Sequence, residues 1–491
     1  MSAGSTLVVL ADPKEWTISG PGVEVVAARD YLSESRFAEL RGVRVFNLCR
    51  SYRYQSYGYY VSLLATARGH RPIPGVTTIQ GLRSATVTRT ITEDLEDLVR
   101  RSLAPIQSDR FLVSIYFGRN PARRHDRLAR ALFNLFPAPL LRARFERGIE
   151  GWRLAGLRLI AMNDVPATHR DFLVQVATDY FQRGGKRRAR ARKARYDLAI
   201  LVDPTAPESR RPSNEGALRR FERAAKTVGF AVDRITREDY GRIAEYDALF
   251  IRETTYVAHY TYRFAARGEA EGLAVIDDPE SIVRCTNKVY LAELLKRHRI
   301  PVPRTLVVHR GNVQRVEPEL GLPCVLKQPD SAFSQGVIKV ATAQELLAET
   351  DRLLESSDLI VAQAFTPTEF DWRVGVIEGR PLFVSRYHMA RRHWQIVQRQ
   401  GERSVFGKVE TLAVADAPRH VVRAAVRAAV AVGRGLYGVD VKQAGRRAFV
   451  IEVNDNPNID SGIEDKVIGQ ELYEAVMASL MRQVEARGRR D

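Results

Sequence analysis

Near its C-terminus the chain reads VIEVNDNPNID, from Val450 to Asp460. The apolar residues of this stretch predict a partly buried β-strand, yet Glu452 lies inside the strand and carboxamides crowd its end. Burying a carboxylate costs free energy unless a positive group meets it. The stretch therefore predicts that a cation or a basic side chain faces Glu452.

A second acidic residue lies on the partner strand of a predicted hairpin. Asp440 ends the run YGVD, and Glu452 and Asn454 follow it across an AGRR turn. In an antiparallel hairpin Asp440 and Glu452 can face one another, while Glu452 and Asn454, two residues apart, share a face. Three oxygen donors suit Mg²⁺ or Mn²⁺, itself carrying nucleotide phosphates. The alternative is an acidic hairpin that pairs with Arg446 and Arg447.

Two lysines strengthen the case for phosphate binding. Lys288 begins the predicted helix NKVYLAELLKRH, and Lys327 lies within the predicted strand of PCVLKQP. A lysine inside an apolar strand needs an anionic partner, which phosphate oxygens supply. The next segment, DSAFSQGVIKV, is a turn of small residues with a glycine, able to fold over phosphates with its backbone N–H groups. By itself this turn is a weak signal, because it matches neither common phosphate-loop motif.

Length and composition set the broad class. A chain of 491 residues with 45% hydrophobic and 27% charged residues is globular and predicts roughly two to four domains. Cys49, Cys285 and Cys324 form no CxxC or Cys/His pattern, which argues against a disulfide framework or a zinc site and favours a reducing compartment. No stretch approaches the length of a membrane span, so the expected location is the cytoplasm.

The net charge of +18 is unevenly placed. Residues 1–195 contain 33 Lys and Arg against 17 Asp and Glu, or +16, and the remainder contains 43 against 41, or +2. Much of the excess lies in RGGKRRARARKAR, residues 183–195. We interpret this run as a solvated, extended linker, because like charges repel. The alternative is a patch for nucleic acid or an acidic protein, which no nucleic-acid-binding motif supports.

Alternating strand and helix patterns predict an α/β chain with three folded parts. Strand–helix–strand spacing after the basic run implies the parallel sheet of a small doubly wound domain. The expected divisions are an N-terminal accessory α/β domain (1–182), the basic linker (183–195), the doubly wound domain (196–284) and a C-terminal domain (285–485) that contains the residues above.

The order of these motifs resembles the ATP-grasp superfamily. Within it, FDWRVGVIEGRPLFVSRY, GVDV and IEVNDNPNIDSGIE resemble the RimK and glutathione-synthetase branch. The resemblance covers roughly residues 196–485, and residues 1–190 resemble more weakly the extra N-terminal region of some RimK-like proteins. It implies an ATP-grasp fold, in which two α+β subdomains clasp ATP, behind a pre-ATP-grasp α/β domain.

The resemblance also implies roles for individual residues. Lys288 and Lys327 would hold the ATP phosphates, and Arg373 and Arg386 would lie near the γ-phosphate and the acyl group as catalytic residues. Asp440, Glu452 and Asn454 would bind two magnesium ions. The remaining ATP contacts would come from the small-residue loop, from the strand end that forms the adenine hinge, and from a carboxylate on the ribose: Ser331, Ser334, Gln335, Gly336, Gln363, Ala364, Phe365 and Asp371 or Glu369.

Two departures from the family pattern concern the hinge and the substrate loop. Ala364 stands where the family usually has a hinge glutamate, and Asn456-Pro457-Asn458 replaces a small residue, proline and glycine. The substrate side is therefore expected to differ from that of close RimK relatives. We expect Arg252, Tyr256, Arg263 and Asn456 to help hold a substrate that bears a carboxylate.

The implied activity is ATP-dependent carboxylate–amine ligation through an acyl phosphate, adding an amino acid to a peptide, a protein or a small metabolite. Two alternatives remain at this point. An ATP-grasp kinase would use the same ATP site, and an ATP-binding interaction protein would dock nucleic acid or an acidic partner on its basic N-terminal half. No membrane partner is expected, and homo-oligomer formation is left open.

Overall fold

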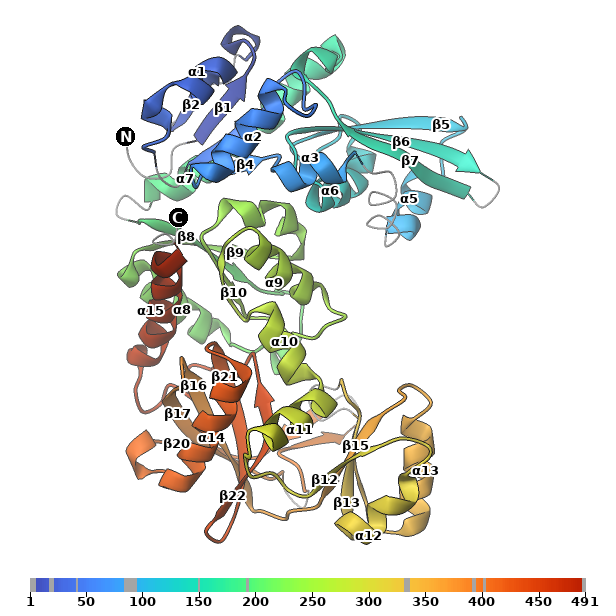
Figure 1. Cartoon of the computed structure of the whole chain (residues 1–491), viewed down its shortest axis with the longest axis vertical. Coiled ribbons are helices and arrows are strands. Elements are labelled where there is room, and N and C mark those ends of the chain that lie inside the picture. The colour runs from blue at the N-terminus through green and yellow to red at the C-terminus, as the bar shows by residue number, and fades with distance from the viewer. Residues whose placement is uncertain are drawn as a thin grey trace.

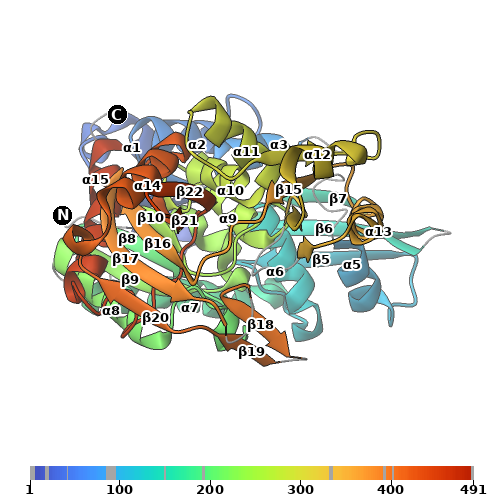
Figure 2. The same ribbon diagram turned by 90° about the horizontal axis from the view of Figure 1, so that it is seen from below.

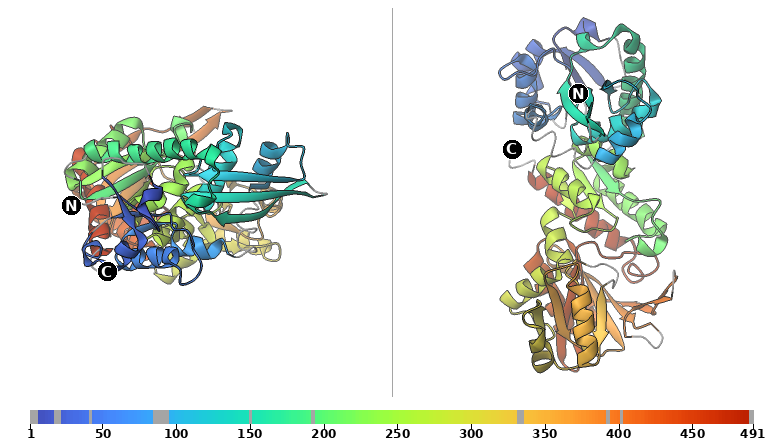
Figure 3. Two further views of the ribbon diagram at one scale, coloured as in Figure 1. Left: turned by 90° about the horizontal axis from the view of Figure 1, so that it is seen from above. Right: turned by 90° about the vertical axis from the view of Figure 1, so that its right-hand side faces the viewer.

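The computed structural model places three parts of the chain in a row along its longest axis (Figure 1 and Figure 3). It describes residues 6–16, 22–40, 43–83, 95–148, 151–190, 194–330, 336–390, 394–400 and 403–487. The N-terminal part lies at one end, the doubly wound domain in the middle, and the part that contains Glu452 at the other end. No helix within these described ranges has both the length and the hydropathy to cross a bilayer.

The N-terminal part contains two sheets. The first is parallel, with the strand order β2-β1-β3-β4, and the second is antiparallel, with the order β5-β6-β7. Helices α5 and α6 pack with β5–β7 around one apolar core. The strands are β1 (Thr6–Leu10), β2 (Val23–Ala27), β3 (Arg44–Asn47), β4 (Arg71–Ile73), β5 (Arg110–Tyr116), β6 (Leu140–Gly148) and β7 (Gly151–Leu159). The helices are α1 (Ala28–Ser33), α2 (Tyr57–Ala67), α3 (Val76–Gly81), α5 (Glu96–Leu103) and α6 (Asp126–Leu135).

The basic run is helical over most of its length. Helix α7 (Arg170–Arg190) enters it from the N-terminal side, and residues 191–193 lie outside the described part of the chain. The apolar residues Leu173, Ala177 and Phe181 anchor the first half of α7 in the N-terminal core. The expectation of an extended linker over residues 183–195 was therefore wrong up to residue 190, because a helix nucleated on that core continues into the charged segment.

The middle domain is doubly wound, as the sequence predicts. Its four strands are parallel and follow the order β11-β10-β8-β9. Helix α8 ends at Gly229, whose φ of 106° is the left-handed conformation that glycine favours at a helix C-terminus. The elements are β8 (Tyr196–Leu201), α8 (Glu215–Val228), β9 (Phe230–Ile235), β10 (Ala248–Ile251), α9 (Tyr260–Ala270), β11 (Ala274–Ile276) and α10 (Pro279–Thr286).

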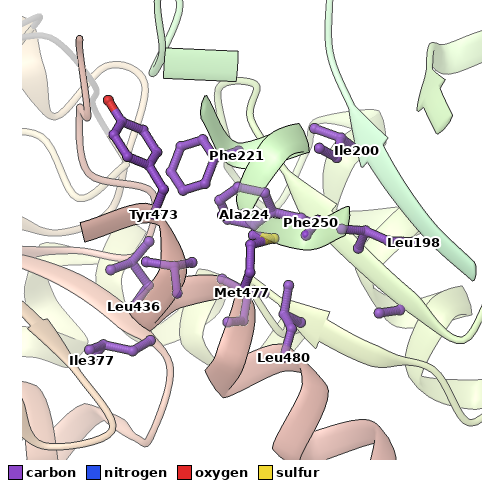
Figure 4. Close-up of a cluster of buried hydrophobic side chains, with 14 of the residues drawn as sticks. Leu198, Ile200, Phe221, Ala224, Phe250, Ile377, Leu436, Tyr473, Met477 and Leu480 are labelled. Atoms are coloured by element: carbon purple, nitrogen blue, oxygen red, sulfur yellow. The ribbon is translucent and has the colours of Figure 1, made fainter. Parts of the chain in front are cut away.

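The last helix of the chain packs on this middle domain. Helix α15 (Gln470–Arg487) lies against α8, and Phe221 and Tyr473 meet edge to face with ring centroids 4.7 Å apart (Figure 4). Met477 and Leu480 of α15 join the same buried cluster. The C-terminal part of the chain thus closes back onto the domain that precedes it, which the spacing of motifs did not predict.

The C-terminal part consists of two subdomains with separate antiparallel sheets. One has the order β12-β15-β13-β14, and the other has the order β20-β17-β16-β21-β22 and packs on α14 (Figure 2). The expected strands RTLVV, PCVLKQP, GVIKV and LIVAQAF are β12, β13, β14 and β15. The strands are β12 (Thr305–Val308), β13 (Cys324–Lys327), β14 (Val337–Val340), β15 (Ile360–Ala364), β16 (Phe370–Ile377), β17 (Arg380–His388), β18 (Val397–Gln400), β19 (Arg403–Phe406), β20 (Val409–Leu412), β21 (Leu436–Ala444) and β22 (Arg447–Asn454). The helices are α11 (Lys288–Arg297), α12 (Val316–Leu320), α13 (Ala343–Leu353) and α14 (Arg419–Val432).

A buried ion pair joins the N-terminal part to the middle domain. Arg44 Nη1 of β3 lies 2.8 Å from Glu245 Oε2, and their side chains are 5% and 3% exposed. The Tyr180 hydroxyl of α7 donates to the other oxygen of Glu245 at 2.7 Å. Removing one partner of such a pair leaves a charge buried without compensation, which is strongly destabilising.

We therefore expect Glu245→Gln to destabilise the contact between the N-terminal part and the middle domain by about 3 kcal/mol. Differential scanning calorimetry of the full chain should show a lower first transition. Glu319→Gln, which removes an exposed pair with Arg315, is the matched control and should leave the thermogram unchanged. Equal effects from the two substitutions would contradict a structural role for the buried pair.

Candidate active site

The predicted site residues gather around one large cleft. The cleft has a volume of about 1500 Å³ and is lined by the middle domain and by both C-terminal subdomains. Most of the described candidates line it: Arg252, Tyr256, Lys288, Lys327, Gln363, Ala364, Phe365, Asp371, Arg373, Asp440, Glu452, Asn454 and Asn456. Ser331, Ser334 and Gln335 fall outside the described residues, and Gly336, with φ 68°, begins the next described segment.

The hairpin of β21 and β22 presents its acidic residues to this cleft. Asp440 and Glu452 are cross-strand partners, and Asn454 pairs with Gly438 on the same ladder. The Asn454 amide lies 3.4 Å from Asp440 Oδ2. The register predicted from the spacing is therefore the one observed, and it directs three oxygen-bearing side chains to one edge of the sheet.

Arg373 balances the charge of Asp440. Its Nε and Nη2 donate to the two carboxylate oxygens at 2.7 and 2.8 Å, a bidentate geometry, and both residues lie on directly paired positions of β16 and β21. Bidentate charge-assisted pairs of this kind are strong and hold both side chains in one orientation. Arg373 is thus fixed at the cleft wall, beside the acidic hairpin.

Lysines balance the charge of Glu452. Lys288 Nζ lies 3.3 Å from Glu452 Oε1, and Lys327 Nζ donates to the buried Gln363 side chain at 2.8 Å. Burial opposes ionisation of Glu452, but the ammonium groups of Lys288 and Lys327 outweigh it, so the pKa of this carboxyl is lowered. A basic side chain therefore does face Glu452, and it is Lys288, which the sequence analysis assigned to phosphate binding.

The donor set fits a hard divalent cation that also takes ligand oxygens. Among the described residues no three His, Cys, Asp or Glu side chains could hold a metal by themselves. Asp440, Glu452 and the amide of Asn454 supply two carboxylates and one carboxamide, and carboxylates keep free lone pairs after a bidentate pair forms. Mg²⁺ is commonly bound by one or two carboxylates together with substrate phosphates. Arg446 and Arg447, the predicted alternative partners, form no ion pair with these carboxylates within the described residues.

The strand end that we expected to bind adenine lies at the same cleft. Ala364 and Phe365 line it, and Lys339 Nζ stands 4.3 Å from the centroid of the Phe365 ring. Asp371 accepts hydrogen bonds from Lys442 Nζ at 2.7 Å and from the Thr368 hydroxyl at 2.9 Å. Glu369 is exposed and does not line the cleft, so Asp371 is the better candidate for ribose.

Lys442 is a cleft residue that the sequence analysis missed. It follows Asp440 by two positions on β21, so strand alternation places it on the same face. This spacing could have identified it. Its contact with Asp371 links the two hairpin strands to the edge of the expected nucleotide site.

The prediction for Arg386 was wrong. Arg386 pairs with Trp372 across β16 and β17, and alternation places both on the face opposite to Arg373 and Asp371. Its guanidinium stacks over the rings of Phe370 and Trp372, with ring centroids 5.1 and 4.9 Å from Cζ. Arg386 does not line the cleft. The cross-strand partner of Arg373 is Ser385, and Arg386, the next residue, points to the opposite face of the sheet.

The substrate candidates divide into two groups. Arg252 is 3% exposed and donates to Asn456 Oδ1 at 2.6 Å and to Pro457 O at 2.9 Å, so it joins β10 to the segment after β22. These contacts make Arg252 a structural clamp at the edge of the cleft, with its guanidinium taken up by protein partners. Asn456 is its partner, Tyr256 lines the cleft with 40% exposure, and Arg263 on α9 does not line it.

Two parts of this chain match known protein families. Residues 28–176 match the family of RimK-like ATP-grasp N-terminal domains, and residues 285–480 match the family of RimK-like ATP-grasp domains. A probable alpha-L-glutamate ligase of Vibrio vulnificus is 26% identical over 248 residues, 48% of this chain and 77% of the relative. An alpha-aminoadipate–LysW ligase of Sulfolobus acidocaldarius is 25% identical over 250 residues, 48% of this chain and 86% of the relative.

Among solved structures, a D-alanine–D-alanine ligase from Bacillus anthracis aligns with a TM-score of 0.46 at 14% identity. The alignment covers 60% of this chain and 99% of that chain. A RimK domain ATP-grasp protein from Sphaerobacter thermophilus aligns with a TM-score of 0.42 at 17% identity, over 58% of this chain and 98% of that chain.

The environment of Lys327 makes binding of a polyanionic ligand depend on pH. Burial lowers the pKa of Lys327 to about 8, and the ligand is bound best when the lysine is charged. Affinity for the ATP analogue AMP-PNP should therefore fall about fivefold between pH 8 and pH 9, as the free lysine loses its proton. Isothermal titration calorimetry measures this, with Lys327→Arg as the matched variant that keeps its charge. The same pH dependence in Lys327→Arg would contradict the assignment.

Proposed function

We propose that this chain, which matches the RimK-like ATP-grasp domain over residues 285–480, is a ligase whose cleft joins a carboxylate to an amine at the expense of ATP, with an amino acid as one of the two substrates. The observation that carries the proposal is the convergence of Asp440, Glu452, Asn454, Lys288 and Lys327 on one cleft. The same cleft is lined by the middle domain, where a second substrate has room to bind beside the nucleotide.

In the first step the γ-phosphoryl group of ATP is transferred to the substrate carboxylate, giving an acyl phosphate and ADP. Lys288 and Lys327 hold the phosphates, while the strand end at Gln363–Phe365 binds adenine and Asp371 takes the ribose hydroxyls. Asp440, Glu452 and Asn454 would hold two magnesium ions. Magnesium bound there would neutralise phosphate charge. We assign Ser331, Ser334, Gln335 and Gly336 to the loop over the phosphates on the family pattern.

Arg373 is the residue that we assign to the transferring phosphoryl group. It lines the cleft, and Asp440 fixes its guanidinium by two hydrogen bonds. A preorganised cation costs no reorganisation when negative charge shifts during transfer, which is why such groups lower the barrier. Arg386 has no part in this step, since it packs behind the sheet.

In the second step the amine nitrogen attacks the acyl carbon. A C–N bond forms, the C–O bond to phosphate breaks, and inorganic phosphate and a proton are released. One relative is named a probable alpha-L-glutamate ligase and another an alpha-aminoadipate–LysW ligase. We propose the same class here, an amino acid joined to a peptide, a protein or a small metabolite.

The two remaining parts of the chain receive supporting roles in this proposal. Residues 196–284 form the substrate wall of the ATP-grasp domain at 285–485, and residues 1–182 are an accessory domain. We place the reaction in the cytoplasm, since the three cysteines are free and buried. An ATP-binding interaction protein without catalysis is not favoured, because such a protein needs neither Arg373 nor the whole oxygen donor set.

Release of ADP and phosphate from Mg-ATP tests the proposal. With pools of amino acids and peptides, we expect turnover that requires both a carboxylate and an amine. Asp440→Asn and Glu452→Gln should each lower the rate on the order of a hundredfold or more, because they remove charge from the metal-binding hairpin. Glu349→Gln on α13, which loses only an exposed pair with Arg352, is the control and should keep full activity.

Two results would contradict the proposal. ADP release that needs a hydroxyl compound but no amine would indicate a kinase. Nucleotide binding without turnover in any pool would indicate a protein that only senses ATP.

A further inference from the structure

The switch point of the middle sheet opens into the cleft. In the order β11-β10-β8-β9, the chain runs from β8 to its neighbour β9 and then crosses to β10 on the other side of β8. The direction in which strands are added therefore reverses between β8 and β10. Open α/β sheets bind ligands outside the carboxyl ends of the strands at such a point. The residues after β8 and β10, among them Asp203 and Glu253, line the cleft.

Glu253 is an unusual residue at this position. It is 6% exposed, and its Oε1 accepts a hydrogen bond from the Tyr260 hydroxyl. Its Oε2 is buried and has no hydrogen-bond partner within the described residues. No ion pair of Glu253 occurs in that part of the chain either. Buried polar atoms are rarely left without a partner, and those that are often mark a ligand site.

Aromatic residues follow Glu253 on the same segment of the chain. Tyr256 and His259 also line the cleft, and their rings stack with centroids 4.8 Å apart. His259 and Tyr260 follow with centroids 4.2 Å apart. A carboxylate beside aromatic faces suits an organic ammonium group, which gains both an ion pair and cation–π attraction. A metal ion would need further oxygen or nitrogen ligands, and the described residues provide no such cluster.

The surroundings of Glu253 also favour a positive ligand electrostatically. Burial, and to a smaller extent the charge of Asp203, raise the pKa of its carboxyl to about 8, while Arg237 opposes the shift. A bound cation would offset this unfavourable environment.

The backbone places Glu253 close to the proposed reaction centre. Its carbonyl accepts a hydrogen bond from Asn456 Nδ2, and Asn456 is two residues beyond Asn454. The neighbouring Thr255 hydroxyl donates to Asp455 at 2.7 Å. The segment after β10 therefore crosses the segment after β22, and a small molecule can reach from Glu253 toward the oxygen donors on β22.

We propose that Glu253, together with Tyr256 and His259 on the same cleft-lining segment, binds the α-ammonium group of the amino-acid substrate. The inference rests on the proposed function and adds to it the residue that selects an amino acid over a plain carboxylic acid. It replaces the earlier expectation that Arg252, the preceding residue, binds substrate.

The test measures binding and needs no turnover. The twenty L-amino acids, beginning with L-glutamate, are screened by isothermal titration calorimetry against the full chain saturated with Mg-AMP-PNP. The best ligand is then compared with the same acid without its amino group, which is glutarate in the case of glutamate. The wild-type chain should prefer the amino acid at least tenfold, and Glu253→Gln should reduce this preference to less than twofold.

Two further variants separate recognition from a general structural effect. Glu208→Gln removes an exposed carboxylate from the same cleft and should keep the wild-type preference. Tyr256→Leu should lower the preference several-fold without changing affinity for AMP-PNP. Unchanged AMP-PNP affinity and melting temperature in Glu253→Gln show that the variant is folded.

The inference is overturned if the wild-type chain binds no amino acid, or if Glu253→Gln keeps the preference. The second outcome is distinct from failure of the proposed function, whereas the first also removes the amino-acid substrate from that proposal. A ligase that turns over with an unaltered preference in Glu253→Gln would refute only the ammonium site. A preference lost in the variant without any turnover would refute only the ligase.

Discussion

Two carboxylates that face each other across one hairpin, Asp440 and Glu452, set the requirement that the rest of the site meets. Carboxylates on directly paired strand positions, one buried and one half-buried, are unstable unless positive charge surrounds them. The chain provides that charge from three separate elements: Arg373 from β16, Lys288 from the start of α11, and Lys327 from β13 of the other subdomain. The negative charge of one hairpin therefore attracts basic side chains from two sheets and a helix, and these elements meet around the cleft.

The same hairpin continues into the segment that joins the C-terminal part to the middle domain. Arg252 binds Asn456 and the carbonyl of Pro457, and helix α15 then packs on α8. The wall that carries Glu253 is thus attached directly to the strand that carries Glu452 and Asn454. The proposed ammonium site and the proposed site of phosphoryl transfer therefore lie next to each other. The chain after β22 and the buried guanidinium of Arg252 connect them.

Much of this arrangement was predictable from local patterns. The pairing of Asp440 with Glu452, the strand that contains Lys327 and the doubly wound middle domain all follow from strand alternation and from strand–helix spacing. Alternation applied to β17 would also have shown that Arg386 lies behind the sheet, and applied to β21 it would have identified Lys442.

What local patterns could not provide was contact between distant segments. Arg252 looked like a substrate ligand because its partners, Asn456 and Pro457, lie some two hundred residues away. Glu253 stands out only because one of its two carboxylate oxygens, Oε2, is buried without a partner among the described residues. Oxygen-18 tracing tests the acyl phosphate directly. With the substrate carboxylate labelled in both oxygens, ligation through an acyl phosphate predicts one labelled oxygen in each inorganic phosphate released, and unlabelled phosphate would contradict carboxylate activation in this cleft.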